Sequence, residues 1–239
     1  MAPLNAGYQQ LVDEALARYP GAPRMTLEVT ALRLQTACND IQALVRQNIL
    51  DIGCGSPKSL DHPSLIQRIA TRFRPIHHCL PWYCRLAALA KDLHDGDGEI
   101  TGIDLGDNKD EPFNGIKRDL TDPHTLGSIS DESFDVVNNN LFTFPEQSQI
   151  GILGFSPALR RHLLSRRETL LDRLQFVLHG SSHAMRNSEG HDTLRQFSQQ
   201  IHAQVTRLLR TGGTYTFGPL VYRKSNAGLI PENAESTSA

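Results

Sequence analysis

The stretch that most constrains the fold of this chain is residues 48–56, which read Asn-Ile-Leu-Asp-Ile-Gly-Cys-Gly-Ser. A short apolar run that carries an acid passes directly into a turn with two glycines. This pattern predicts a buried strand that opens into a loop with few side chains. Gly53 and Gly55 can take backbone angles closed to other residues, and they allow a ligand to approach the main chain closely. If a helix follows, its free N–H groups face the same ligand. The stretch therefore predicts a ligand-binding loop at the end of a strand.

Residues 50–55, Leu-Asp-Ile-Gly-Cys-Gly, resemble the first motif of the class I S-adenosylmethionine-dependent methyltransferases. In that family an acid-x-Gly-x-Gly turn follows the first strand and cradles the methionine end of the cofactor. The resemblance implies four cofactor-binding residues here: Asp51, Gly53, Cys54 and Gly55. Pro57 stands where this type of family often has a third glycine. A lone Gly-x-Gly also occurs at ordinary strand-to-loop turns, so the interpretation depends on the rest of the chain.

The length and composition of the chain limit the classes of protein to which it can belong. Its 239 residues suit one domain with additions better than two full domains. A hydrophobic content of 39% with 21% charged residues is typical of a soluble globular protein. The formal net charge of −2 does not favour a protein built mainly to hold nucleic acid.

The same sequence bears on the compartment in which the protein works. No apolar run reaches the roughly 18 residues needed to span a bilayer, and the N-terminus lacks the basic and apolar regions of a signal peptide. The four cysteines do not make a disulfide framework in a chain of this length. We therefore expect a cytoplasmic protein without a membrane partner.

Two helices are predicted ahead of the glycine loop. Residues 5–19 and 26–47 each carry apolar residues at helical spacing, and a Pro-Gly-Ala-Pro segment separates them. Both precede the first strand, so they lie outside the minimal nucleotide-binding unit. The helices of region 1–47 either pack against the sheet or, as in the family that the chain resembles, cap the cofactor and the substrate.

A long segment separates the glycine loop from the next predicted strand, residues 99–104. An Asp-Gly-Asp-Gly turn comes directly before that strand, and residues 86–93 carry the apolar face of a crossover helix. Residues 56–81 are left as an insertion, with a short helix predicted at 63–73. A loop at the carboxyl end of the first strand of a doubly wound sheet lies beside the ligand crevice. We therefore expect the insertion to wall or cover the substrate site.

The second predicted strand ends in an acid, Asp104. A carboxylate at that point can accept hydrogen bonds from both hydroxyls of a ribose. The resemblance accordingly assigns Asp104 and the adjacent Leu105 to the cofactor site.

The third and fourth predicted strands add further residues to this site. Residues 115–118 form the third strand, and the Asp119 and Leu120 that follow match two residues of the family. There an acid contacts the adenine amino group and the next residue packs on the ring. Phe-Asp-Val-Val from Phe134 resembles the family's fourth strand, which ends beside the methionine and the methyl group. The resemblance therefore assigns Asn139 to the cofactor site.

The C-terminal part of the chain predicts one more helix and one more strand. Residues 194–208 have a helical apolar pattern that ends in 209–213, and 214–217 form the fifth strand. The run Leu-Leu-Arg-Thr-Gly-Gly resembles the family's Leu-Lys-Pro-Gly-Gly before strand five. The roughly twenty residues that follow are too few for the family's final helix and hairpin. We expect a reduced or absent C-terminal hairpin, with 220–222 at most a single edge segment, and a flexible tail at 226–239.

Catalytic and metal-binding residues are less clearly indicated. A helix is predicted from residue 156, and its five arginines between 160 and 173 form either a solvated face or a site for an anionic group. His179 and His183 lie in the polar break after it, and they are the candidates for a general base that a hydroxyl acceptor would need. The histidines and cysteines of 62–84 match no common zinc module, so no metal site is predicted.

Together these elements predict one α/β domain over residues 1–239, with a doubly wound, mainly parallel sheet in the order 3-2-1-4-5. The resemblance implies transfer of a methyl group from S-adenosyl-L-methionine to a small molecule with a hydroxyl or an amine. The alternatives are a protein that binds this cofactor without methyl transfer, and a methyltransferase that acts on RNA or protein. A nicotinamide dehydrogenase fits less well, because Lys58 stands where Gly-x-Gly-x-x-Gly has its third glycine.

Overall fold

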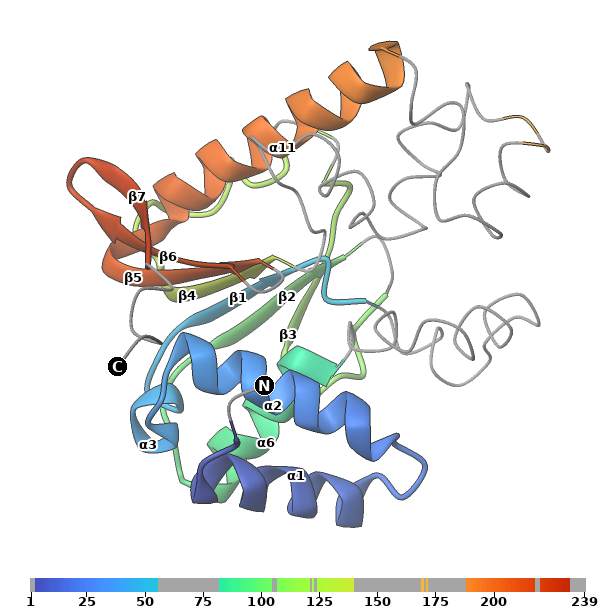
Figure 1. The fold of residues 1–239 in the computed structure, drawn as a ribbon, viewed down its shortest axis with the longest axis vertical. Helices are drawn as coiled ribbons and strands as arrows, with labels where there is room; N and C mark the ends of the chain where they lie inside the picture. Colours follow the sequence, from blue (N-terminus) through green and yellow to red (C-terminus); the bar gives the residue numbers. More distant parts are fainter. Residues whose placement is uncertain are drawn as a thin grey trace.

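The computed structural model describes residues 3–55, 82–104, 107–120, 122, 124–139, 169, 171, 188–217 and 220–232. Within these residues the chain forms one seven-stranded sheet in the order β3-β2-β1-β4-β5-β6-β7 (Figure 1). The strands are β1 (Ile49–Ile52), β2 (Ile100–Asp104), β3 (Asn114–Lys117), β4 (Phe134–Asn139), β5 (Leu209–Phe217), β6 (Leu220–Ser225) and β7 (Gly228–Pro231). The predicted α/β class is confirmed.

The first five strands run parallel, and β1 lies in the middle of them. It pairs with β2 on one side and β4 on the other, while β3 and β5 pair with β2 and β4. Asp51 of β1 lies opposite Gly102 of β2 and Asn138 of β4. Because parallel neighbours end at the same edge of a sheet, the ends of β1, β2 and β4 meet there. We call this the carboxyl-terminal edge.

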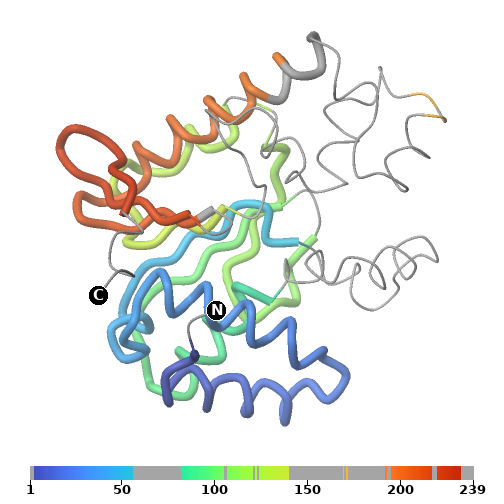
Figure 2. The backbone as a smooth tube through the Cα atoms, in the orientation of Figure 1, coloured from blue at the N-terminus to red at the C-terminus, as the bar shows by residue number. Residues whose placement is uncertain are grey.

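Helices cover both faces of the sheet (Figures 1 and 2). One face carries α1 (Ala6–Arg18), α2 (Arg24–Ala37), α3 (Ile41–Leu44) and α6 (Trp82–Leu93), and the other carries α11 (Ser188–Leu208). Each face has its own hydrophobic cluster: Ile49 and Val136 pack with α1, α2 and α6, whereas Leu50 and Val137 pack with α11. This division follows from the strand period of two, which sends neighbouring side chains to opposite faces.

The second N-terminal helix is shorter than the predicted 26–47. α2 ends at Ala37, where Cys38 takes extended backbone angles, with φ of −148° and ψ of 112°. A separate turn of helix, α3, then begins behind Asp40, whose side chain accepts a hydrogen bond from the Gln42 N–H at 2.9 Å. The uninterrupted helix was therefore a wrong prediction, because an aspartate that caps the next turn was counted into a continuous helical pattern.

The fifth strand begins earlier than predicted. The prediction ended a helix within 209–213 and began the strand at Thr214, but α11 ends at Leu208 and β5 begins at Leu209. Leu209 is paired with Phe134, and the register then jumps so that Val136 is paired with Thr214. The additional residues form a bulge in which Gly212 has a φ of 83°. The two glycines therefore serve the strand and do not end the helix.

The predicted five-stranded sheet is wrong at its far side, because β6 and β7 add an antiparallel hairpin and make the sheet mixed. The hairpin fits in few residues because its turn is short. Ser225 Oγ accepts from the Ala227 N–H at 3.1 Å, and Gly228 leaves the turn with a φ of 119°. The tail predicted from residue 226 therefore includes β7, and only its last part, 233–239, lies outside the described residues.

Several predicted elements lie outside the described residues, namely the insertion at 56–81 and most of the helical region that begins at residue 156. Over the part of the chain that is described, no helix combines the length and apolar character that crossing a bilayer requires.

Candidate functional site at the carboxyl-terminal edge

The glycine loop leaves β1 at the carboxyl-terminal edge in the conformation that its sequence predicts. Gly53 and Gly55 have φ angles of 72° and 80°, in a region that side chains with a Cβ enter only at a cost. The Gly53 and Cys54 N–H groups donate to the Ile103 carbonyl at 2.8 and 3.2 Å. The loop is therefore held against the end of β2.

Asp104 connects the end of β2 to the same loop. Its Oδ2 accepts a hydrogen bond from the Gly55 N–H at 3.0 Å, across 49 residues of sequence, and the residue is partly exposed. An ionised carboxylate has about four acceptor positions on two oxygens and can therefore bind several donors at once. The glycine loop and the Asp104 carboxylate therefore lie together at the point where β1 has β2 on one side and β4 on the other.

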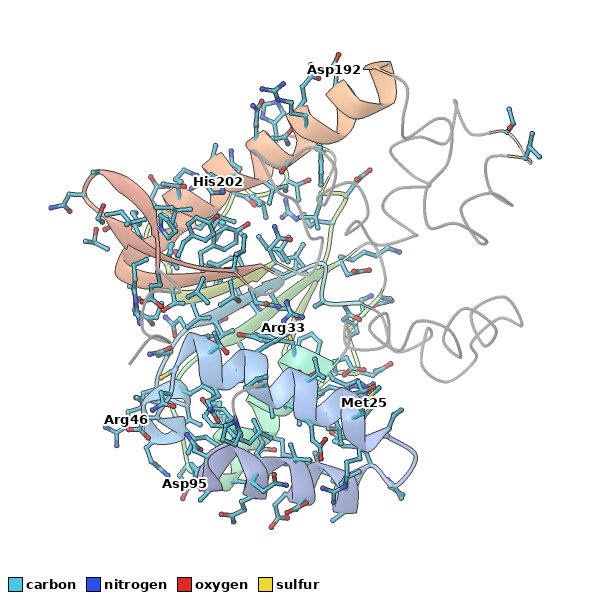
Figure 3. All side chains as sticks on the ribbon, in the orientation of Figure 1. Met25, Arg33, Arg46, Asp95, Asp192 and His202 are labelled. Carbon is cyan, nitrogen blue, oxygen red and sulfur yellow. The ribbon has the colours of Figure 1, made fainter. Side chains whose placement is uncertain are left out.

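A polar cluster lies below this loop, on the face of the sheet that α2 and α6 cover (Figure 1). We call it the Asp51 cluster, and its members are Arg33, Asp51, Cys84, Asn138 and Thr216. Asp51 Oδ1 accepts from Asn138 Nδ2 at 2.6 Å, and the Cys84 thiol lies 3.5 Å from Asp51 Oδ2. Asn138 Oδ1 accepts from Arg33 Nη2 at 2.7 Å and from Thr216 Oγ1 at 3.0 Å. Figure 3 shows Arg33 between α2 and the sheet. The cluster joins β1, β4, β5, α2 and α6.

Burial dominates the electrostatics of Asp51, which is fully shielded from solvent. Burial disfavours the charged form and raises the pKa of its carboxyl from 3.8 to about 7. The Asn138 hydrogen bond, the Arg33 charge and the Cys84 hydrogen bond lower that pKa, while the Asp104 charge raises it slightly. The site therefore contains a buried acid that titrates near neutral pH.

The two buried cysteines of this region are held as neutral thiols. Burial raises the pKa of Cys84 well above its ordinary value. A hydrogen bond with Cys84 lowers the pKa of Cys54, but burial and the charges of Asp51 and Asp104 leave it raised. Asn108 Nδ2 also donates to Cys54 Sγ at 3.3 Å. Because the thiolate is the reactive form, neither cysteine is suited to act as a nucleophile.

Asn139, the last residue of β4, lies on the opposite face of the sheet. Its Nδ2 donates to the Tyr215 hydroxyl at 2.9 Å, and the Tyr215 ring packs edge-on against His202 of α11 with 5.8 Å between ring centroids. Figure 3 shows His202 at the side of α11 that faces the sheet. Asn139 is therefore fixed by the layer that covers the other face.

The residues predicted to hold adenine lie after β3. Leu120 is buried and belongs to the hydrophobic cluster beneath α11. The Asp119 carbonyl accepts from the Asp122 N–H at 3.2 Å and from the Thr125 hydroxyl. These bonds form a tight turn at the end of the strand, and the assignment of Asp119 and Leu120 to a ligand stays a prediction.

The structure brings together some of the predicted site residues and leaves others undescribed. Asp51, Gly53, Cys54, Gly55 and Asp104 meet at one edge. Leu105, His179 and His183 lie outside the described residues. In the described part of the chain, no group of three or more histidine, cysteine or acidic side chains is arranged to hold a metal ion.

Sequence analysis assigned Asn139 of β4 to the site and missed four members of the Asp51 cluster: Arg33, Cys84, Asn138 and Thr216. Arg33 is one of the polar residues of its helix, and Cys84 comes just after the insertion. Neither lies in a local sequence pattern that indicates a site. Thr216 does lie in one, because it alternates with Tyr215 in a strand pattern and therefore shares a face with Thr214.

Comparisons of the chain with descriptions of protein families, with curated proteins and with solved structures found no match.

Proposed function

We propose that this chain binds S-adenosyl-L-methionine at the carboxyl-terminal edge and transfers its methyl group to a small molecule, in the manner of the Rossmann-like methyltransferases that its motifs resemble. The observation that carries the proposal is the hydrogen bond from the Gly55 N–H to Asp104 Oδ2 at 3.0 Å. It joins the glycine loop and the acid at the end of β2, which are the two motifs that the family uses for one ligand.

The chemistry of the described residues fits this cofactor. The backbone of a loop with two left-handed glycines, at 72° and 80° in φ, offers close approach to a ligand. Asp104 would accept hydrogen bonds from ribose hydroxyls, and Asp119 and Leu120 would hold the adenine. Asn139 ends the strand that lies nearest the methyl group in the family. Ligands of open parallel sheets bind at such an edge, where neighbouring strands lead away in opposite directions.

The cofactor would supply a methyl group on a sulfonium, which makes its own leaving group. The residues of this chain then have to align the acceptor with the methyl group and exclude water. A small acceptor with a hydroxyl or an amine agrees with a net charge of −2, because a nucleic-acid acceptor calls for a basic groove.

Calorimetry with S-adenosylhomocysteine and with NAD tests the binding part of the proposal. We expect S-adenosylhomocysteine to bind and NAD to bind more weakly or not at all. Asp104→Ala should weaken binding by about 1.5–3 kcal/mol, the range for a hydrogen bond to a charged group. Asp110→Ala is the matched control, since Asp110 is an exposed acid in the segment that follows β2. Tighter binding of NAD, or equal affinities in the two variants, would contradict the proposal.

Transfer of a radiolabelled methyl group tests the catalytic part. Cell extract is separated into small molecules, RNA and protein, and each fraction is incubated with the protein and labelled S-adenosylmethionine. We expect label in the small-molecule fraction. Label in RNA or protein would replace the proposed acceptor class, and binding without any transfer would identify a cofactor-binding protein.

A further inference from the structure

The side-chain amide of Asn138 is shared by three other elements of the fold. Its oxygen accepts from Arg33 Nη2 of α2 at 2.7 Å and from Thr216 Oγ1 of β5 at 3.0 Å. Its nitrogen donates to Asp51 Oδ1 of β1 at 2.6 Å. A guanidinium can only donate, so the end of the amide that faces Arg33 must be the oxygen. The nitrogen therefore faces Asp51, and the orientation of the amide is fixed by chemistry.

This orientation favours a charged Asp51. An N–H that donates to a carboxyl oxygen stabilises the ionised form, and the Arg33 cation on the far side of the amide adds a favourable charge. Burial acts in the opposite direction, since Asp51 has no exposed surface. Among the described residues, the other titratable groups that act on this site are the Cys84 thiol and the Tyr83 hydroxyl of α6, the Cys54 thiol of the glycine loop and the Asp104 carboxyl of β2.

We propose that Asn138 is a positioning residue that keeps the buried Asp51 carboxyl able to ionise at neutral pH, so that a negative charge stands below the glycine loop. Asp51 comes two residues before Gly53, and Asn138 lies directly opposite it in the sheet. Without the Asn138 amide, Asp51 loses a donor at 2.6 Å and the amide no longer lies between it and Arg33. The acid would then stay protonated to higher pH.

The charge of Asp51 bears on ligand choice, a consequence that rests on the proposed function. S-adenosylmethionine carries a sulfonium cation, whereas its demethylated product S-adenosylhomocysteine carries a neutral thioether. An ionised Asp51 below the loop favours the cation, and the low dielectric of a buried site strengthens that preference. The structure thus supplies a means by which the reactant is held in preference to the product as the pH rises through neutrality.

The first experiment needs no ligand. Protein labelled with ¹³C at the aspartate carboxyl carbons is titrated by NMR, and the resonance absent from Asp51→Asn identifies Asp51. We expect a midpoint of about 7 in the parent protein. Asn138→Leu should raise it by about one pH unit, a tenfold change in the ionisation equilibrium. Thr214→Val is the matched control, because Thr214 is a buried threonine on the same face of β5 as Thr216. This variant should leave the Asp51 midpoint unchanged.

An unchanged midpoint in Asn138→Leu would overturn the inference. Asn138→Ala, which introduces no larger side chain, replaces it if the leucine variant does not fold. The parent protein alone also provides a test. An Asp51 midpoint above about 9 contradicts an acid that ionises at neutral pH, and a midpoint near the ordinary aspartate value of about 4 contradicts a charge that changes as the pH passes neutrality.

The second experiment measures the affinities of S-adenosylmethionine and S-adenosylhomocysteine from about pH 6 to pH 8. The sulfonium of S-adenosylmethionine lowers the pKa of its own α-amino group, so Asp51→Asn, which meets the same two ligands without the Asp51 charge, is the reference for the pH dependence. Relative to Asp51→Asn, the preference for S-adenosylmethionine should rise at least about threefold over this range in the parent. In Asn138→Leu the rise should move to higher pH. A preference that is the same in the parent and in Asp51→Asn at every pH would overturn the link to ligand choice. Failure of both ligands to bind at any pH would overturn the proposed function and leave the NMR result intact.

Discussion

Strands β1 and β4 bury different kinds of side chain on their two faces, although these side chains belong to neighbouring residues of the same strands. Toward α11 they present Leu50, Ile52 and Val137, all with no exposed surface. Toward α2 and α6 they present Asp51 and Asn138, which are equally buried. At these positions the α11 face is apolar, and Asn139 at the end of β4 is its buried polar residue. The α2 face instead carries the Asp51 cluster, with the charged Arg33 at its side, next to the apolar Ile49 and Val136.

The two faces of β1 and β4 contribute differently to stability and to function. Burying apolar side chains is favourable by roughly 25 cal/mol per Å², whereas burying a carboxyl costs free energy that hydrogen bonds only partly offset. The polar cluster lies at the end of β1 and β4, next to the glycine loop. We infer that the apolar face holds the sheet together and that the polar face serves the carboxyl-terminal edge.

The largest expected effect comes from a cavity on the apolar face. Leu50→Ala should lower the free energy of unfolding by about 2–5 kcal/mol, because the truncated side chain leaves a void under α11. Urea denaturation at constant pH measures the change. Leu93→Ala is the control, since this leucine at the end of α6 is 41% exposed and its truncation leaves no cavity. Equal losses in the two variants would contradict a stabilising role specific to the α11 face.

The polar face should instead determine a pH dependence of stability. The pKa of Asp51 is raised from 3.8 to about 7 on folding, so the folded state binds a proton that the unfolded state has released. This contribution to stability is complete below about pH 4 and is lost as the pH rises through about 7. The stability of the parent relative to Asp51→Asn should therefore fall across this window, by up to about 4 kcal/mol for a shift of about three pH units. Urea titrations of both proteins at several pH values test it, and a constant difference would show that Asp51 does not titrate there.

The apolar face and the glycine loop were the parts that could be predicted from the sequence. Runs such as Ile-Leu-Asp-Ile and Phe-Asp-Val-Val indicate strands by local composition. The meeting of Gly55 with Asp104 follows from parallel strands that share an edge. Local pattern and topology are sufficient for both.

The polar face could not be predicted, because its members come from separate elements. Arg33 precedes the buried Leu34 on α2, and only the packing of that helix on the sheet brings it to Asn138.

The hairpin was missed for another reason. Its turn is built from a serine side chain and Gly228 in very few residues, so counting the residues after strand five underestimated what they could form.

The stability of the glycine loop, which follows β1, should be sensitive to a single added methyl group. Gly53 has a φ of 72°, and a non-glycine residue in the left-handed region costs about 1–2 kcal/mol. Gly53→Ala should lower stability by about that amount, as measured by thermal unfolding. Gly21→Ala is the control, because Gly21 does not have a positive φ and a Cβ added there meets no atom within 4 Å. It should be neutral or slightly stabilising. A neutral Gly53→Ala would mean that the loop relaxes without strain.

The smallest effect on stability is expected from an ion pair that is exposed to solvent. Arg18 and Asp92 join α1 to α6 with 3.3 Å between Nη1 and Oδ2, but their side chains are 52% and 57% exposed. Exposed ion pairs gain little over hydration, so Arg18→Ala should cost less than about 1 kcal/mol, and the loss should shrink as salt screens the pair. Asp92→Ala and the double variant complete a double-mutant cycle that isolates the interaction. A coupling energy as large as the effect of Leu50→Ala would contradict the expectation that exposed polar contacts stabilise this fold far less than buried side chains do.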